Sequence, residues 1–271
     1  MDSVDRELQK QHLTILASHG QPQFTNTWFP YTSGEVGPYY VQSVAVTRNG
    51  DHFAQAVEAL CTLISSSHTL DGYDIITGGE TRDWAFSFPV AYALGKPHAM
   101  IYNSGKVVDA SLEGKRVLHV ADLNNEGSSF RDKWVPTIRK AGGEIVEAFF
   151  YVDRREDGVQ VLENRGVPSS SVVPLDSHAW DILREQSYIT PELYDSLQER
   201  MEDKRAWAHR ALRGNIEQLE NMLLDRGKRA KALKIINIGY PEIAKELVET
   251  MNKRGHLIMN KPGEDYEPQT I

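Results

Sequence analysis

The sequence predicts an α/β protein whose core is a doubly wound, mostly parallel β-sheet with helices on both faces. Short apolar runs alternate with stretches of helical periodicity between residues 73 and 152, which is the rhythm of consecutive βαβ units. Polar segments follow these runs, as expected where parallel strands end at one edge of a sheet. The composition, 40% hydrophobic and 25% charged over 271 residues, is typical of a globular protein with one large core or two unequal ones.

The first 48 residues are predicted to form a helix and a hood-like segment. Residues 4–18 carry apolar side chains at helical spacing, which predicts a helix. Residues 21–37 are rich in Pro, Thr, Gly and aromatic side chains, and this composition indicates irregular structure. The alternation over 39–46 predicts a strand, and the pattern over 51–64 predicts a second helix.

The α/β core is expected to occupy residues 49–185. Its predicted strands and helices are, in order, strand 73–77, helix 85–94, strand 99–102, strand 116–120, helix 130–141 and strand 144–152. In open α/β sheets, ligands bind outside the carboxyl ends of the strands. The segments that follow these strands, namely 78–83, 102–106, 122–129 and 153–158, are therefore expected around one crevice.

Residues 186–271 are predicted to be a helical C-terminal extension. Helical patterns cover 190–197 and 241–253, and 201–224 is predicted to be one long amphipathic helix. Residues 234–238 fit either a strand or a helix, and 259–271 have the character of a tail. No catalytic-looking cluster occurs in this third of the sequence, so we interpret it as a packing or dimerisation extension.

Charge and composition exclude several classes of function. A formal net charge of −8 argues against nucleic acid as a partner, because proteins that bind phosphate backbones are usually basic. No apolar run reaches the roughly 18 residues of a membrane-spanning helix, and the acidic N-terminus is unlike a secretory signal. The single Cys61 excludes an intrachain disulfide framework and fits the reducing cytoplasm. We expect a cytoplasmic protein that acts on a small molecule, without nucleic acid or membrane as a partner.

A strand, a polar turn and the start of a helix follow one another between residues 117 and 130. The turn holds Gly127, which permits an unusual backbone angle, and two serines that offer hydroxyl groups. Backbone amides of such a turn and the helix dipole point toward the same place, which makes an anion site. Asp122, at the mouth of the strand, has a carboxylate suited to hydroxyl groups or a metal. Simple helix capping after a buried strand is the alternative interpretation.

Several stretches, in the same order and spacing, resemble orotate phosphoribosyltransferases of the type I phosphoribosyltransferase family. Residues 32–40, Thr-Ser-Gly-Glu-Val-Gly-Pro-Tyr-Tyr, are similar to the family segment S-G-x-x-x-P-x-Y. Residues 79–81 and 91–97 resemble its second loop and the helix that follows. Residues 114–129 resemble its 5-phosphoribosyl pyrophosphate (PRPP) motif, and 152–158 resemble its D-R-x-E-x-G element. The resemblance implies a Rossmann-like type I phosphoribosyltransferase core.

The resemblance also implies an activity and a set of site residues. Such enzymes transfer phosphoribose from PRPP to a nitrogenous base, here one like orotate, with release of pyrophosphate, Mg²⁺ as cofactor and a homodimer as the assembly. By resemblance, the catalytic residues are Lys106 and Asp122, and Asp122 also holds Mg²⁺ through ribose hydroxyls or water. The implied PRPP and phosphate contacts are Arg82, Asn125, Glu126, Gly127, Ser128 and Ser129, and the implied base contacts are Ser33, Tyr39, Tyr40 and Arg154.

The same motifs depart from the family pattern at several positions. Ala121 stands where the family has the first of two acidic residues, and Glu126 places a negative charge in the phosphate turn. At about 4 Å that repulsion would be a few kcal/mol. Of the family's mobile catalytic loop only Lys106 remains. A second function therefore stays open, that of a non-catalytic protein with this fold that binds a different, possibly phosphorylated, small ligand or regulates a partner.

Overall fold

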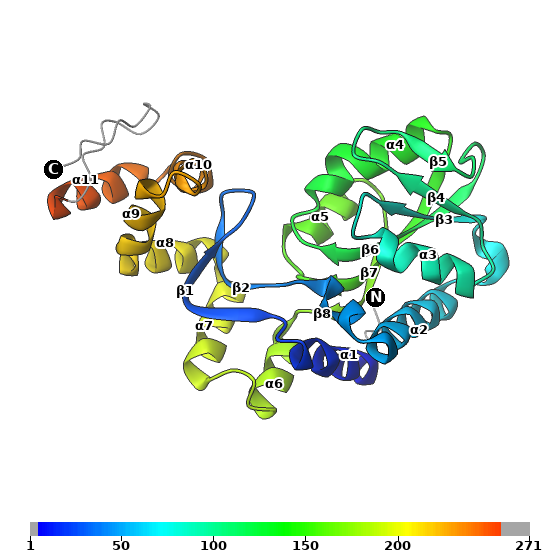
Figure 1. Cartoon of the computed structure of the whole chain (residues 1–271), viewed down its shortest axis with the longest axis horizontal. Helices are drawn as coiled ribbons and strands as arrows, with labels where there is room; N and C mark the ends of the chain where they lie inside the picture. The colour runs from blue at the N-terminus through cyan, green and yellow to red at the C-terminus, as the bar shows by residue number, and fades with distance from the viewer. Residues whose placement is uncertain (1–4, 256–271) are drawn as a thin grey trace. The chain divides into compact units, whose positions relative to one another are not determined.

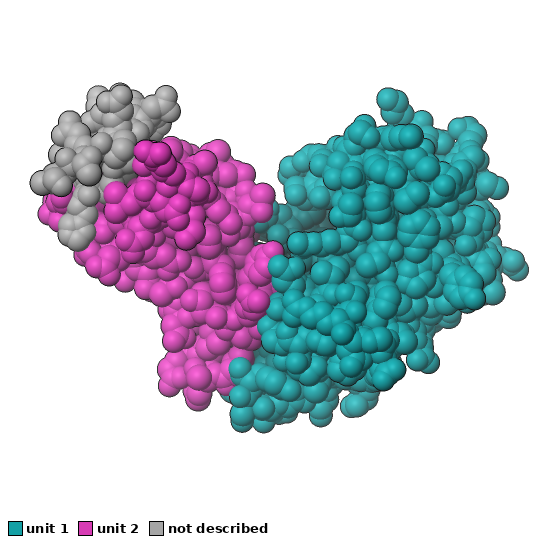
Figure 2. Space-filling model, in the orientation of Figure 1, with its two compact units in different colours: residues 1–21, 42–188 teal, residues 22–41, 189–271 magenta. Residues whose placement is uncertain are grey.

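The computed structural model describes residues 5–255, and the tail predicted at 259–271 lies outside them. The chain divides into two compact units (Figure 2), one made of residues 1–21 and 42–188 and the other of residues 22–41 and 189–271. We call these unit 1 and unit 2. Residues 1–48, predicted as a single N-terminal segment, are thus shared between the two units.

Unit 1 is built on a six-stranded sheet with the strand order β5-β4-β3-β6-β7-β8 (Figure 1). All neighbouring strands are parallel except β4 and β5, which confirms the predicted mostly parallel sheet. The strands are β3 (Ile75–Gly79), β4 (His98–Ile101), β5 (Val107–Asp109), β6 (Arg116–Asn124), β7 (Glu144–Asp153) and β8 (Ser169–Pro174).

Helices cover both faces of this sheet, with α1, α2 and α3 on one side and α4 and α5 on the other (Figure 1). The helices of unit 1 are α1 (Arg6–Ser18), η1 (Ser43–Arg48), α2 (Gly50–Ser67), η2 (Leu70–Gly72), α3 (Trp84–Ala93), η3 (Phe130–Trp134), α4 (Val135–Lys140), α5 (Asp157–Glu163) and α6 (Ser177–Glu185). Asp5, Asn49 and Asp176 begin three of them, each accepting a backbone N–H three residues on. Such caps contribute about 1 kcal/mol each.

The core of unit 1 lies against the two longest strands, β6 and β7, which are neighbours in the sheet and are buried along most of their length. One apolar cluster joins them to η3, α4 and α5 through Val117, Ala121, Phe130, Trp134, Val135, Ile138, Phe150 and Leu162. Burying one large apolar side chain contributes about 1.5–3 kcal/mol. The continuous apolar runs that predicted these strands therefore reflect burial on both faces.

Two predicted strands differ from the structure. The strand predicted at 39–46 is wrong, because β2 ends at Tyr40 and the chain then forms the 3₁₀ helix η1. β6 continues past the predicted 116–120 to Asn124, since its last residues pair with β7, Leu123 opposite Val152. Asp122 thus lies inside a paired strand. Strands β5 and β8 and helix α5 were not predicted.

Unit 2 combines a two-stranded antiparallel hairpin with the C-terminal helices. Its elements are β1 (Gln23–Pro30), β2 (Val36–Tyr40), α7 (Pro191–Glu202), α8 (Lys204–Gly214), α9 (Ile216–Leu224), α10 (Arg229–Lys234), η4 (Ile235–Gly239) and α11 (Ala244–Arg254). The prediction of irregular structure over 21–37 is therefore wrong for most of that segment. Residues 234–238, left open above, are helical.

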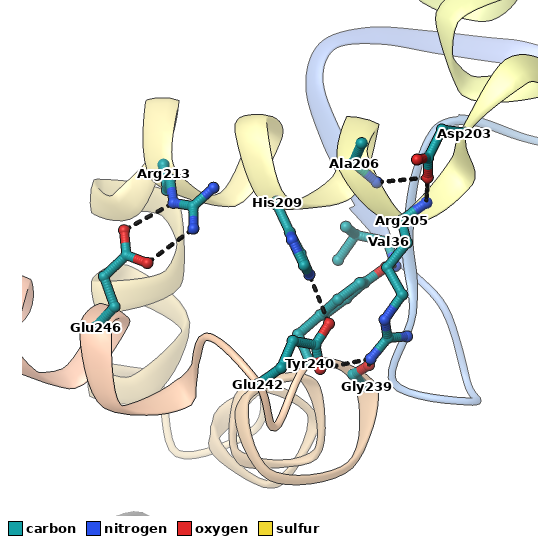
Figure 3. A network of polar contacts seen from close by, with 10 residues as sticks. All are labelled: Val36, Asp203, Arg205, Ala206, His209, Arg213, Gly239, Tyr240, Glu242 and Glu246. Atoms are coloured by element: carbon teal, nitrogen blue, oxygen red, sulfur yellow. Dashed lines mark hydrogen bonds and ion pairs between the residues drawn. The ribbon is translucent and has the colours of Figure 1, made fainter.

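The long helix predicted at 201–224 is wrong, because the chain breaks at two polar residues. At Asp203 the backbone is extended, and the carboxylate accepts the N–H groups of Arg205 at 3.0 Å and Ala206 at 2.8 Å (Figure 3). This cap starts α8 anew. At Asn215 the backbone again leaves the helical region, and α9 begins at the next residue.

The hairpin belongs to the core of unit 2. Trp28 and Val36 from the two strands share one buried apolar cluster with Trp207, Leu212, Leu219, Leu223, Ile236 and Leu247 of the helices. The Val36 N–H donates to the Tyr240 hydroxyl at 3.1 Å (Figure 3). The Gln218 amide donates to the Trp28 carbonyl at 2.7 Å. The C-terminal helices are therefore the packing partner of the hairpin.

Ion pairs add to the contacts among these helices. Arg205 and His209 of α8 both reach Glu242, each at 2.6 Å, and Arg213 reaches Glu246 of α11 at 2.7 Å (Figure 3). Exposed contacts of this kind contribute little to stability. Within residues 5–255, none of the helices is long and apolar enough to cross a membrane.

Candidate functional site

Asp122 stands near the carboxyl end of β6 and is held at both its side chain and its backbone. Its side chain is 6% exposed, and its Oδ2 accepts a hydrogen bond from the Ser43 hydroxyl at 2.6 Å. Ser43 comes from η1, 79 residues earlier, and is itself buried. The Asp122 backbone N–H donates to Asp83 Oδ1 at 3.2 Å. The orientation of this carboxylate is therefore set by two other segments.

Asp83, just before α3, links the ends of β3 and β6. Its second oxygen accepts the Gly79 N–H at 3.0 Å, and the Asp122 N–H reaches its first. The His119 ring lies with Nε2 3.7 Å from the same carboxylate, while its Nδ1 is 2.9 Å from the Thr77 hydroxyl. A buried acid thus bridges the two strand ends that border the predicted crevice.

The two neighbouring carboxyl groups are both costly to ionise because they are buried. Burial raises the pKa of Asp122 to about 7, and the charge of Asp83 adds to the increase, while the Ser43 hydrogen bond and Arg82 oppose it. Burial likewise raises the pKa of Asp83 to about 6. Burial lowers the pKa of His119 to about 3, so this ring is neutral at pH 7. Near neutral pH the pair retains part of a proton.

The turn after β6 packs against the start of α5. Gly127 has φ +66, and a Cβ there would lie 2.9 Å from the Val161 side chain and 3.0 Å from Gly158 Cα. The Gly158 N–H donates to the Asn125 carbonyl at 3.1 Å. Ser128 and Ser129 are exposed and lead into η3. Because the first amides of a helix lack partners within it, this turn has the properties of an anion site.

Arg154 supports that turn from the end of β7. Its guanidinium donates to Asn125 Oδ1 at 2.6 Å and to Glu156 at 2.8 Å, and its backbone N–H donates to the Asn124 carbonyl. The residue is 4% exposed. These contacts orient Arg154 toward the turn of residues 125–129, and its assignment to the base stays a prediction.

The two predicted cationic residues differ in placement. Arg82 is exposed, and its charge opposes the raised pKa of Asp122, so it acts electrostatically on the site. Lys106 is exposed in the tight turn between β4 and β5, where its carbonyl accepts the Tyr102 N–H at 2.9 Å. Among residues 5–255 no hydrogen bond or ion pair joins the Lys106 side chain to Asp122.

The remaining predicted base contacts belong to unit 2. The Ser33 hydroxyl accepts the Glu35 N–H at 3.2 Å. Tyr39 is buried, and the Tyr40 ring centroid is 6.3 Å from that of Phe29. These residues lie in a different unit from Asp122, and their role in base binding stays a prediction.

Sequence reasoning missed Ser43 and missed the bridging role of Asp83. Ser43 lies inside a strand that was wrongly predicted, and no local sequence pattern indicates its contact with Asp122, 79 residues along the chain. At Asp83, an acidic residue between an apolar run and a helix is typical of a helix start. Its side chain does not cap α3 and instead accepts the N–H groups of Gly79 and Asp122, which no local pattern indicates.

The side chains available as metal ligands near Asp122 determine which metal ion could bind there. No group of three or more His, Cys, Asp or Glu side chains suited to a metal occurs in the part of the chain that the structure describes. Asp122 and Asp83 offer carboxylate oxygens alone, which suit Mg²⁺ that arrives with phosphate oxygens as its other ligands. The residues therefore fit a substrate-bound Mg²⁺ better than a resident metal.

These features define an α/β protein with two buried carboxyl groups and a glycine-containing turn at the edge of a mostly parallel sheet. No model of a known protein family matches the chain. A relative named orotate phosphoribosyltransferase, from Sulfolobus acidocaldarius, is 31% identical over 150 residues, covering 53% of this chain and 74% of the relative. Another, named adenine phosphoribosyltransferase, from Escherichia coli, is 31% identical over 129 residues, covering 40% of this chain and 70% of the relative.

A solved structure shows the same fold. Orotate phosphoribosyltransferase from Aeropyrum pernix superimposes with a TM-score of 0.56 at 21% identity, covering 65% of this chain and 99% of that one. The chain belongs to the phosphoribosyltransferase family. The resemblance drawn from the sequence motifs is confirmed, and so is the predicted fold class.

Proposed function

We propose that the chain binds PRPP at Asp122 and the turn 125–129 and transfers its phosphoribosyl group to an orotate-like base. The observation that carries the proposal is the placement of Asp122 near the end of β6, directly before a turn that starts a helix. A carboxylate suits ribose hydroxyls, and the turn suits a 5′-phosphate. Relatives named orotate phosphoribosyltransferase support the same activity.

In this reaction a ring nitrogen of the base forms a bond to C1′ of the ribose, and the bond from C1′ to pyrophosphate breaks. The ring nitrogen loses its proton, which leaves to the released pyrophosphate or to solvent. The protein's part is to position the ribose and balance charge as the leaving group departs. Asp122 would hold the ribose hydroxyls, while Asn125, Gly127, Ser128 and Ser129 would hold the 5′-phosphate. Arg82 and Lys106 would face the pyrophosphate as cations.

Mg²⁺ would be held mainly by pyrophosphate oxygens, with Asp122 as the protein group in contact through ribose hydroxyls or water. When bound, it would neutralise negative charge that builds up on the leaving pyrophosphate. This chain contributes an ionisable carboxylate with a raised pKa, so the deprotonated form required for the contact is more abundant above pH 7.

Relatives carry the names of both orotate and adenine phosphoribosyltransferases, so the experiment must compare these two bases. Ser33, Tyr39, Tyr40 and Arg154 are the proposed base contacts. A carboxylated base such as orotate would suit the cationic Arg154, whereas adenine has no carboxylate.

The test is an assay of the full chain with PRPP, Mg²⁺ and either orotate or adenine. Formation of the base's 5′-monophosphate together with pyrophosphate is expected for orotate and should fall sharply in Asp122→Asn. If adenine is converted and orotate is not, the proposed phosphoribosyl transfer stands, with adenine as the base in place of orotate. An absence of nucleotide from both bases, with PRPP shown to bind, would refute the transferase.

A second candidate is a non-catalytic protein that binds another small ligand or regulates a partner. The Glu126 charge in the phosphate turn and the partly protonated pair Asp83 and Asp122 favour it. This candidate predicts no PRPP binding at millimolar concentration.

The proposal also includes a homodimer and a cytoplasmic location. The dimer follows from the family resemblance, and the location follows from the single cysteine. Light scattering that gives the mass of one chain at micromolar concentration would refute the dimer.

A further inference from the structure

Ser43 makes a contact that differs from those of the other hydroxyl in η1. Its Oγ donates to Asp122 Oδ2 at 2.6 Å, and the two residues are 79 positions apart. Thr47, in the same 3₁₀ helix, donates its hydroxyl to the nearby Val44 carbonyl and is exposed. Local bonds of the Thr47 kind are the usual behaviour of serine and threonine. The Ser43 contact is instead directed at the carboxylate of the proposed site.

The bond has the length of a strong, charge-assisted contact. Hydroxyl groups that donate to carboxylates lie at about 2.5–2.7 Å and form bonds roughly twice as strong as neutral ones. Ser43 is 1% exposed and Asp122 is 6% exposed, so water is poorly placed to replace the donor. Asp83 accepts the Asp122 backbone N–H and also contacts its carboxyl group, while Ser43 donates a hydroxyl hydrogen bond to Oδ2 of that carboxyl group.

We infer that Ser43 is a positioning residue for the phosphoribosyl site, whose hydroxyl orients the Asp122 carboxylate to receive the ribose hydroxyls of PRPP. This inference rests on the proposed function. Ser43 acts through Asp122 and need not touch the substrate itself. Misplacement of a binding group by about 1 Å costs on the order of 100-fold in a reaction, and the loss of one orienting bond should cost less, about tenfold in PRPP affinity.

The test is a double-mutant cycle read by calorimetric titration of the full chain with Mg²⁺ and PRPP. The four proteins are the wild type, Ser43→Ala, Asp122→Asn and the double variant, with Thr47→Ala as a matched control from the same helix. Ser43→Ala should weaken PRPP binding about tenfold, and it should have little further effect once Asp122 is changed. Thr47→Ala should bind PRPP as the wild type does.

Two results would overturn the inference while PRPP binding itself stands. One is Ser43→Ala binding PRPP as tightly as the wild type. The other is an equal loss in the Asp122→Asn background, because the serine would then act elsewhere. If the wild type binds no PRPP, the proposed function fails and the inference falls with it.

A second variant separates binding from folding. Ser43→Cys keeps the shape of the side chain, with a somewhat larger terminal atom, and replaces the hydroxyl with a weak donor. Should Ser43→Ala fail to fold, Ser43→Cys is expected to fold and to weaken PRPP binding in the same direction. Wild-type affinity in folded Ser43→Cys would overturn the inference.

Discussion

At the scale of single residues, the site depends on two carboxyl groups that share a buried environment. Asp83 and Asp122 have pKa values raised to about 6 and about 7, chiefly by burial. An acid with a raised pKa keeps a proton in the folded chain that the unfolded chain has lost. Its contribution to stability is therefore full below the unfolded pKa and is lost as the pH rises through the folded one.

Asp122→Asn should show this dependence. The asparagine side chain carries no charge at any pH. The free energy of unfolding of the variant should therefore rise relative to that of the wild type between about pH 4 and pH 7. The difference should grow by up to about 1.4 kcal/mol per pH unit, the value of one fully linked proton. Chemical denaturation of both proteins at several pH values measures it. Stability curves that stay parallel from pH 4 to pH 8 would show that folding does not raise the pKa of Asp122.

The turn at Gly127 permits a matched test of a close contact. Gly127 and Gly166 have nearly equal positive φ angles, +66 and +65, but only the first would place a Cβ against neighbours, at 2.9 Å. Gly166→Ala should lose about 1–2 kcal/mol of stability from backbone strain alone. Gly127→Ala should lose a further 1–3 kcal/mol, roughly the cost of overpacking. Equal losses by urea denaturation would mean that the turn can move away from α5.

At the scale of elements, the hairpin β1–β2 is the least expected feature. The tip of the hairpin meets η4 so closely that a Cβ on Gly239 would lie 2.1 Å from the Gly34 carbonyl oxygen. A side chain there cannot be accommodated without moving backbone. By contrast, a Cβ on Gly227 would lie 3.4 Å from the Asp225 side chain, an ordinary contact.

Gly239→Ala should therefore destabilise the chain by about 3 kcal/mol, near the upper end for overpacked sites. Gly227→Ala should change stability by less than about 0.5 kcal/mol, as surface substitutions usually do. Thermal unfolding of both variants and the wild type gives the comparison. Similar melting temperatures for the two variants would contradict the close packing of the hairpin on η4.

The elements that were predicted and those that were missed differ in what stabilises them. β6 and β7 could be predicted because burial on both faces leaves a continuous apolar run. β1 could not, because its pairing shifts register between Phe24 and Phe29, and its partner helices lie 190 residues along the chain, as in the bond from Gln218 to Trp28. The breaks at Asp203 and Asn215 interrupt a helix whose apolar stripe continues across them.

The residues of the candidate site also divide into those that local sequence patterns predicted and those that they did not. The strand, turn and helix start around Asp122 and Gly127 were visible as local patterns. The Ser43 contact was not, because a tertiary contact between distant segments leaves no trace in the spacing of either. Arg154 was visible as a motif residue, while its bonds to Asn125 and Glu156 appeared only in the folded chain.

At the scale of the whole molecule, the C-terminal third has a defined structural task. It supplies the helices against which the hairpin of residues 22–41 packs, so unit 2 joins two segments that are far apart in the sequence. The hairpin carries the proposed base contacts Ser33, Tyr39 and Tyr40.

The central claim is that the turn after β6 receives PRPP, and a calorimetric titration of the whole chain with Mg²⁺ and PRPP tests it most directly. We predict saturable binding that weakens at least tenfold in Asp122→Asn. Binding should tighten in Glu126→Thr, because a repulsion of a few kcal/mol at about 4 Å is removed. No detectable heat at millimolar PRPP, or equal affinities in all three proteins, would contradict the claim.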